Sequence, residues 1–358
     1  MNTSFRQSSF ARGFTLVELM VALAIGLLMA FGLVRVFASS SDAYRALAQA
    51  SQQIENGRYA IQMVSQDLQH AGFYGEYGFC PAPGITDSNV CVIPPTVVAL
   101  PDPCEIADAA IMKTGLAFFV QAYSNVAASP VACIDNANVL AGTDVLVIRR
   151  ANTSAIASGA LVANEVYMQA NADSTNIDNP VIAFGTFDAA KYPLLNRLST
   201  GPAEIRKYHV IIYFVSPCSE TVGGVCTAGS DGGRPIPTLK RLMLGLSGGA
   251  LTMRVEPVAE GIQNLQIDYG VDTDRDGVPD GNFLAAPAAV FQWGDVMAAQ
   301  VRVLARTVDP NPGWNDTKTY DLGTAGAYTP AGADTAFQRH LFVSQVRLVN
   351  PAGRREVP

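Results

Sequence analysis

The sequence predicts an α+β protein in which one long N-terminal helix packs on an antiparallel β-sheet head domain with long loops. Three observations lead to this prediction. Residues 14–34 are almost all apolar and residues 38–75 continue with a helical repeat. Later segments alternate apolar and polar residues between connections rich in Gly, Ala, Asn and Ser. Only 15% of the 358 residues are charged, while 31 are Gly and 21 are Pro, which favours a turn-rich domain outside the cytosol.

The first element is a basic leader, residues 1–13, followed by the apolar helix. Glu18 places a carboxylate inside this apolar stretch, where it costs roughly 3 kcal/mol near the centre of a bilayer, so we expect a partner that neutralises it. The alternative is an ordinary secretory signal peptide cut near Val36-Phe37-Ala38. The apolar run is longer than a usual signal h-region and contains an acid, which argues against that alternative.

The helix continues beyond the apolar segment, because a stripe of apolar residues recurs every seven positions: Leu47, Ile54, Ile61 and Leu68, with Tyr44 and Val64 on the same face. The sequence therefore predicts one helix from Phe14 to about Gly72, roughly 88 Å long at 1.5 Å per residue. Gly72 and Gly75 supply its end. We expect residues 14–37 to span a membrane and to pack on other subunits, and residues 38–75 to dock on the head domain.

Strand patterns follow in the head domain, residues 76–358, at 144–149, 165–170, 208–215, 239–244, 265–269, 300–306 and 342–348. Most of them alternate apolar and polar residues, as in an antiparallel sheet with one covered face. The helix stripe is the natural cover. Residues 152–159 and 323–336 are predicted surface loops. No internal repeat and no second independent domain are predicted.

All six cysteines follow the membrane segment, which fits disulfides in an oxidising compartment. Six cysteines allow 15 connectivities. Short loops close most easily, so we favour three neighbouring pairs: Cys80 with Cys91, Cys104 with Cys133, and Cys218 with Cys226. Zinc is the alternative, but there is no C-x-x-C, and none of the three histidines lies near a cysteine at ligand spacing.

Residues 13–29, GFTLVELMVALAIGLLM, resemble the class III signal of type IV prepilins and type II secretion pseudopilins. The resemblance implies that a prepilin peptidase cuts between Gly13 and Phe14 and that the new amino terminus on Phe14 is methylated. It also implies that Glu18, then the fifth residue, pairs with the amino terminus of a neighbouring subunit. Opposite charges attract strongly in hydrocarbon, so such pairing would remove the cost of the buried acid during assembly.

Further motifs are similar to the large minor pilins called PilW: Glu55 to Ala60, Gln66 to Leu68, Ala71 to Gly75, Val301 to Arg306, Arg339 to Phe342 and Val346 to Asn350. This resemblance implies a type IV pilin-like fold. It also implies a minor pilin that primes assembly of a type IV pilus and sits near its tip, in adhesion and twitching motility. A minor pseudopilin of a type II secretion system is the alternative, and an exported enzyme with an unusual signal is a third hypothesis.

The resemblance also implies partners and a location. The expected partners are other minor pilins, the major pilin, a tip adhesin, the prepilin peptidase and the inner-membrane assembly platform. The chain would cross the inner membrane once with its head in the periplasm, and later join the pilus at the cell surface. No nucleic-acid partner is expected, because the chain has a formal net charge of -7 and loses Arg6 and Arg12 with its leader. No catalytic motif is present, so we expect no enzymatic activity.

One segment resembles a calcium loop, with the candidate ligands Asp272, Asp274, Asp276, the carbonyl of Val278, and Asp280. Carboxylates at alternate positions converge on one centre when a glycine permits a sharp turn, and four aspartates this close repel one another without a cation. The loop departs from an EF-hand because Phe283 stands where a bidentate glutamate belongs. The alternative is a solvated Asp-Gly turn. Any role of calcium would be structural or regulatory, and no other cofactor is expected.

Overall fold

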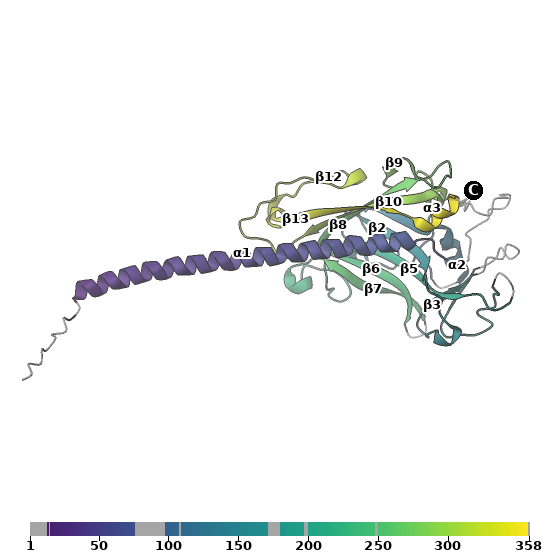
Figure 1. The fold of residues 1–358 in the computed structure, drawn as a ribbon, viewed down its shortest axis with the longest axis horizontal. Coiled ribbons are helices and arrows are strands. Elements are labelled where there is room, and N and C mark those ends of the chain that lie inside the picture. Colours follow the sequence, from purple (N-terminus) through teal and green to yellow (C-terminus); the bar gives the residue numbers. More distant parts are fainter. Residues whose placement is uncertain are drawn as a thin grey trace, which may run out of the picture. The chain divides into compact units, whose positions relative to one another are not determined.

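The computed structural model describes residues 13, 15–75, 97–106, 109–170, 180–196, 200–247 and 250–356. Helix α1 spans Leu16–His70, α2 spans Ala109–Thr114 and α3 spans Val349–Arg355 (Figure 1). The predicted long helix is confirmed. The chain forms two compact units, Met1–Ser51 and Gln52–Pro358, and each is described by itself. The predicted boundaries at residues 13, 37 and 75 stay predictions.

The second unit contains the strands, and every strand pair in the described residues is antiparallel, as predicted. All seven predicted strands overlap an observed one. The strands are β1 Val120–Val126, β2 Thr143–Ala151, β3 Val166–Gln169, β4 Val181–Phe184, β5 Ile205–Ser216, β6 Thr238–Ser247, β7 Ala250–Glu260, β8 Ile262–Val271, β9 Asp280–Leu284, β10 Val296–Arg306, β11 Tyr320–Asp321, β12 Ala327–Tyr328 and β13 Arg339–Arg347.

The strands form two main sheets, where the sequence led us to expect one. A seven-stranded sheet has the order β1-β2-β5-β3-β4, with β6 and β7 added beside β5. A four-stranded sheet has the order β13-β10-β8-β9, and β11 and β12 form a small separate ribbon. The larger sheet branches at β5, because residues 205–207 pair with β3 whereas residues 211–216 pair with β6. Alternation predicts strands but does not assign them to sheets.

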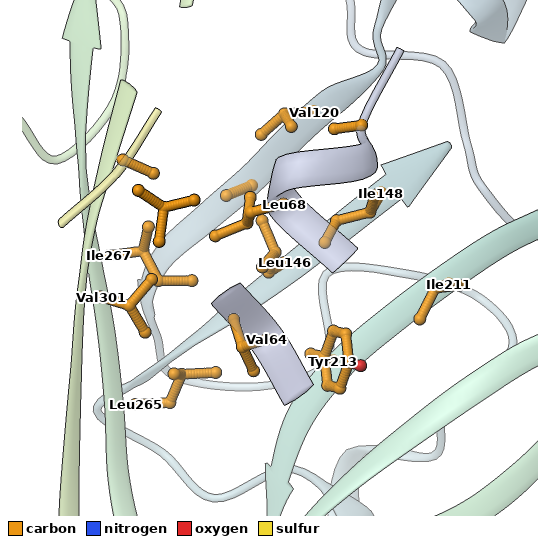
Figure 2. Packing of buried hydrophobic residues seen from close by; sticks show 14 of the residues in the cluster. Val64, Leu68, Val120, Leu146, Ile148, Ile211, Tyr213, Leu265, Ile267 and Val301 are labelled. Carbon is orange, nitrogen blue, oxygen red and sulfur yellow. The ribbon is translucent and has the colours of Figure 1, made fainter. Parts of the chain in front are cut away.

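The last turns of α1 share one hydrophobic core with both sheets (Figure 2). Val64 and Leu68 of the helix are fully buried. Their neighbours in this cluster include Leu146 and Ile148 of β2, Tyr213 of β5, Leu265 and Ile267 of β8, and Val301 of β10. Burying each of these helix side chains contributes about 1.5 to 3 kcal/mol to stability.

The docked face of α1 differs from the predicted stripe. The buried helix residues are Gln53, Gly57, Ala60, Val64, Asp67 and Leu68. The prediction is right for Val64 and Leu68 but wrong for Ile54, which is 39% exposed. Tyr44 and Leu47 are also exposed. A search for apolar residues misses this face because half of it is polar or lacks a side chain.

Polar side chains of the docked face bond to the ends of strands. The Gln53 side-chain amide donates to the Ala305 carbonyl at 2.8 Å, and the Asn56 amide donates to the Glu260 carbonyl at 3.0 Å. Gly57 faces the ring of Phe342, which lies where a side chain at this position would be. These contacts fix the position of the helix along the head domain.

The helix ends as predicted, at two glycines with left-handed backbone. Gly72 and Gly75 both have φ of 72°, which residues with a side chain rarely adopt. The Gly72 amide then donates to the Arg149 carbonyl at 3.0 Å, so the chain passes directly from the helix onto β2.

A second hydrophobic core covers the other face of the larger sheet. It joins Val145 and Val147 of β2 and Phe214 of β5 to Met112 of α2 and to a segment that contains Ile134. The sequence predicted only one covered face, because α2 is only six residues long and residues 127–135 form no helix or strand.

Candidate functional site

The first candidate site is the start of α1. Gly13 and Thr15 are described and exposed, whereas Phe14 and the leader residues 1–12 lie outside the described residues. Glu18 lies in the first turn and is exposed. Its carboxylate accepts hydrogen bonds from the Thr15 amide and the Thr15 hydroxyl, both at 2.9 Å. The Glu18 amide donates to the Thr15 hydroxyl oxygen at 3.2 Å.

The apolar part of α1 follows this turn. By length and composition the helix can cross a membrane, and no part of its most apolar window is buried. Gly26 and Gly32 have no atom within 4 Å of the position that a side chain would occupy. The exposed apolar surface therefore has no partner in the described part of the chain. Glu18 lies at one end of this apolar helix.

The second candidate site is the aspartate loop between β8 and β9. Carboxylate oxygens of Asp272, Asp274 and Asp276 all lie within 4.8 Å of one another, so these three residues could hold a metal ion. Gly277 has φ of 89°, which provides the sharp turn that the pattern requires. Asp274 and Asp276 are exposed and Asp272 is fully buried.

Asp280, another predicted ligand, is not a member of this triad. The Asp280 carboxylate accepts from the Thr273 amide at 2.7 Å and from the Thr273 hydroxyl at 2.8 Å. Val278 is half exposed, and its amide donates to Asp276 at 2.8 Å. Asp280 therefore ties the two ends of the loop together and is not part of the triad.

The aspartates affect one another's protonation. The pKa of Asp274 is raised: a backbone hydrogen bond from Asp276 lowers it, but desolvation and the charges of Asp276, Asp280 and Asp272 together outweigh that bond. The Thr273 hydroxyl and amide lower the pKa of Asp280. Repulsion between these carboxylates contributes to the raised pKa of Asp274, and a bound cation would relieve that repulsion.

Arg355 also belongs to this site, and no sequence pattern predicted it. Its guanidinium lies 2.9 Å from the Asp272 carboxylate and 2.5 Å from the Asp295 carboxylate, and it also donates to the Gly294 carbonyl at 3.1 Å. Asp272 is thus already paired with an internal cation from α3. Because 83 residues separate the two partners, no local pattern could have indicated the contact.

Thr15 was also missed, although its signal is local. The segment Thr15-Leu16-Val17-Glu18 has the threonine-to-glutamate spacing of a helix capping box. The resemblance to prepilins implied only that Glu18 pairs with another subunit.

Two disulfides are present in the described residues, Cys104–Cys133 and Cys218–Cys226. They are two of the three pairs favoured by spacing. Cys80 and Cys91 lie outside the described residues. None of the four described cysteines is left free to bind zinc.

Comparisons with known proteins give two family matches. Residues 212–350 match the family "Type IV Pilus-assembly protein W", and residues 9–34 match the "Prokaryotic N-terminal methylation motif". The first match begins within β5 and ends within α3. The second contains Gly13, Phe14 and Glu18.

A comparison with curated proteins finds no match. Among solved structures, the chain is similar to a type IV-like pilin, TTHA1219 from Thermus thermophilus, with 15% sequence identity. That similarity covers 40% of this chain and 79% of the other, with a TM-score of 0.18.

Proposed function

Because the chain is a PilW-type type IV pilus assembly protein with an N-terminal methylation motif, we propose that it is a minor pilin that primes pilus assembly and is incorporated near the tip. It is a structural subunit and not an enzyme. The observation that carries the proposal is Glu18, a carboxylate in the first turn of an exposed apolar helix.

The proposed mechanism uses the cost of that carboxylate in lipid. The prepilin peptidase cuts between Gly13 and Phe14, the amino terminus of Phe14 is methylated, and Glu18 pairs with the amino terminus of a neighbouring subunit. An acid in hydrocarbon is unfavourable alone and attracts a cation strongly, so assembly is favoured over the free membrane form. The exposed apolar helix supports this step because it offers a surface for other stems.

Replacing Glu18 tests the assembly role. We expect Glu18→Ala to be exported and cleaved normally but to lower the amount of this subunit in sheared pili and the number of surface pili. Glu55→Ala, an exposed acid further along the same helix, is the matched control and should behave as wild type. Normal piliation by Glu18→Ala would contradict the proposal.

Replacing Gly13 tests the processing step separately. Gly13→Leu should leave the leader attached, which N-terminal sequencing of the membrane fraction would detect. A mature N-terminus at Phe14 in this variant would exclude the proposed cleavage site.

The proposal places the chain in the inner membrane with its head in the periplasm before assembly, and in the pilus afterwards. Its partners would be other minor pilins, the major pilin, the assembly platform and a tip adhesin. The alternative, a minor pseudopilin of a type II secretion system, shares the same leader. The match to the pilus assembly family in the head domain supports the pilus.

We further propose that the aspartate loop holds a structural calcium ion through Asp272, Asp274 and Asp276. The Val278 carbonyl and Asp280, which now accepts from Thr273, would join these ligands only when the ion is bound. The convergent triad and the raised pKa of Asp274 support this proposal. Calcium prefers such oxygen ligands, and loops of this kind bind it outside the cytosol.

Calorimetry with calcium and with a chelator tests the site. We expect calcium to raise the melting temperature of the head domain. Asp274→Asn with Asp276→Asn should abolish that increase while leaving the Arg355 contacts to Asp272 and Asp295 in place. Equal melting temperatures of the wild-type protein in calcium and in chelator would exclude a stabilising ion.

A further inference from the structure

The first turn of α1 contains a reciprocal pair of contacts within one chain. The Thr15 hydroxyl accepts from the Glu18 amide, and the Glu18 carboxylate accepts from the Thr15 amide. The Thr15 hydroxyl also donates its proton to the same carboxylate oxygen. Threonine three residues before glutamate, with both bonds formed, is a capping box.

These contacts satisfy groups that would otherwise be costly in a membrane. The first amides of a helix have no partner within the helix, and an unsatisfied backbone group in hydrocarbon costs several kcal/mol. Thr15 and Glu18 therefore provide, within the chain, the acceptors that the lipid lacks.

The carboxylate also gains from the arrangement. A charged acid in an apolar surrounding is stabilised by hydrogen bonds to its charged form. Two donors of Thr15 reach the same oxygen of Glu18, so the acid is partly solvated by its own chain before any other subunit arrives.

We propose that Thr15 is the partner that holds Glu18 in the unassembled subunit, closing the first turn of α1 and keeping the carboxylate hydrogen-bonded until another subunit's cation replaces the threonine. The closing of the turn is independent of the assembly role. The replacement step rests on the proposed function.

Hydrogen exchange of the full-length, uncleaved protein in detergent micelles tests the cap. Thr15→Val removes the hydroxyl at nearly constant shape, and Thr15→Ser retains it. Glu18→Gln retains an acceptor at the third position of the helix, and Glu18→Ala does not. We expect amide exchange in residues 15–20 to be about fivefold faster in Thr15→Val and Glu18→Ala than in wild type.

Thr15→Ser and Glu18→Gln should exchange at close to the wild-type rate, and so should Ser40→Val, a control at an exposed position in the middle of the same helix. Exchange in Thr15→Val equal to that of wild type would overturn the proposal. So would a Thr15→Ser variant that exchanges as fast as Thr15→Val.

Incorporation into pili separates this inference from the proposed function. Glu18→Gln keeps the cap and loses the charge, so we expect normal exchange together with poor incorporation. If Glu18→Gln were incorporated normally and still showed wild-type exchange, the charge-pairing role would fail while the cap would stand.

Discussion

At the scale of single residues, Gly57 shows how the absence of a side chain positions the helix. An added Cβ would lie 2.1 Å from the nearest ring atom of Phe342 and within 2.8 Å of two more. Gly57 is buried in the middle of α1, where glycine lowers helix stability by about 1 kcal/mol relative to alanine. The close approach of β13 explains why glycine is nevertheless suitable here.

We therefore expect Gly57→Ala to destabilise the head domain, although alanine favours a helix. Overpacking of this kind costs about 1 to 3 kcal/mol, which exceeds the gain in helix propensity over most of that range. Denaturant unfolding followed by the fluorescence of the buried Trp293 would measure the change. Phe342→Leu in the same chain should recover part of the loss. A more stable Gly57→Ala variant would show that the ring moves away without cost.

At the scale of elements, α1 is joined to the larger sheet by a buried ion pair. The Asp67 carboxylate lies 2.9 Å from the Arg150 guanidinium of β2 and accepts from the Tyr213 hydroxyl of β5 at 2.6 Å. The side chains of Asp67 and Arg150 are only 7% and 17% exposed. The pair favours this rotation of the helix on the sheet, because turning the helix would separate the Asp67 carboxylate from Arg150 and Tyr213.

Removing one member of this pair should be strongly destabilising. We expect Asp67→Ala to lower the free energy of unfolding by about 3 to 5 kcal/mol, because it leaves the Arg150 charge buried and uncompensated. Glu55→Ala, at an exposed position of the same helix, should change it little. A small effect of Asp67→Ala would mean that water reaches Arg150 in the folded protein.

The long connection between β10 and β13 is held by buried side chains. Residues 307–338 leave β10 and return to β13, and this segment contains the loop predicted at 323–336. The fully buried Arg339 side chain lies 3.2 Å from Asp316 and 2.7 Å from Asp334. The connection also covers Leu304 and Leu341 with Tyr320 and Leu322. It is therefore an ordered layer on the outer face of the smaller sheet.

At the scale of the whole molecule, side chains join the two sheets. The Asp144 carboxylate of β2 accepts from the Asn125 amide at 2.7 Å and from the Ile267 amide of β8 at 2.8 Å. Burial raises the pKa of Asp144 to about 7, although these two bonds lower it. Because its folded-state pKa is raised, the contribution of Asp144 to stability falls as the pH rises from about 4 to 7.

His209 has the opposite effect, because it makes the folded protein less stable as the pH falls. It is 6% exposed, neither ring nitrogen has a hydrogen-bond partner in the described structure, and burial together with the charges of Arg150, Lys207 and Arg241 lowers its pKa to about 3. The unfolded chain binds a proton here below about pH 6.5 and the folded chain does not. Stability is therefore lost as the pH falls from about 6.5 towards 3.

We expect His209→Leu to reduce that loss. Between pH 7.5 and 4.5 the wild-type protein should lose about 3 kcal/mol of stability relative to the variant, which corresponds to two pH units below the unfolded pKa. Unfolding in urea at both pH values would measure the difference. An equal pH dependence in the two proteins would show that His209 is protonated in the folded state.

Local sequence patterns were sufficient to predict the long helix and its glycine end, most of the longer strands, the two disulfides in the described residues, the methylation motif and the position of Glu18. These features depend on residues close together in the chain, so composition and spacing reveal them. The Thr15 cap is also a local feature, because Thr15 lies three residues before Glu18, and this spacing indicates a capping box.

The tertiary structure alone decided the rest. The division of the strands into two sheets depends on which distant strands pair. Apolar and polar residues alternate in the same way in both sheets, so this alternation cannot show to which sheet a strand belongs. On the docked face of α1, Gly57 contacts Phe342, and Asp67 contacts Arg150 and Tyr213. These partners are far away in sequence, and neither Gly57 nor Asp67 is apolar, so the sequence did not indicate that they are buried. Likewise Arg355 reaches Asp272 only because folding places α3 beside the aspartate loop.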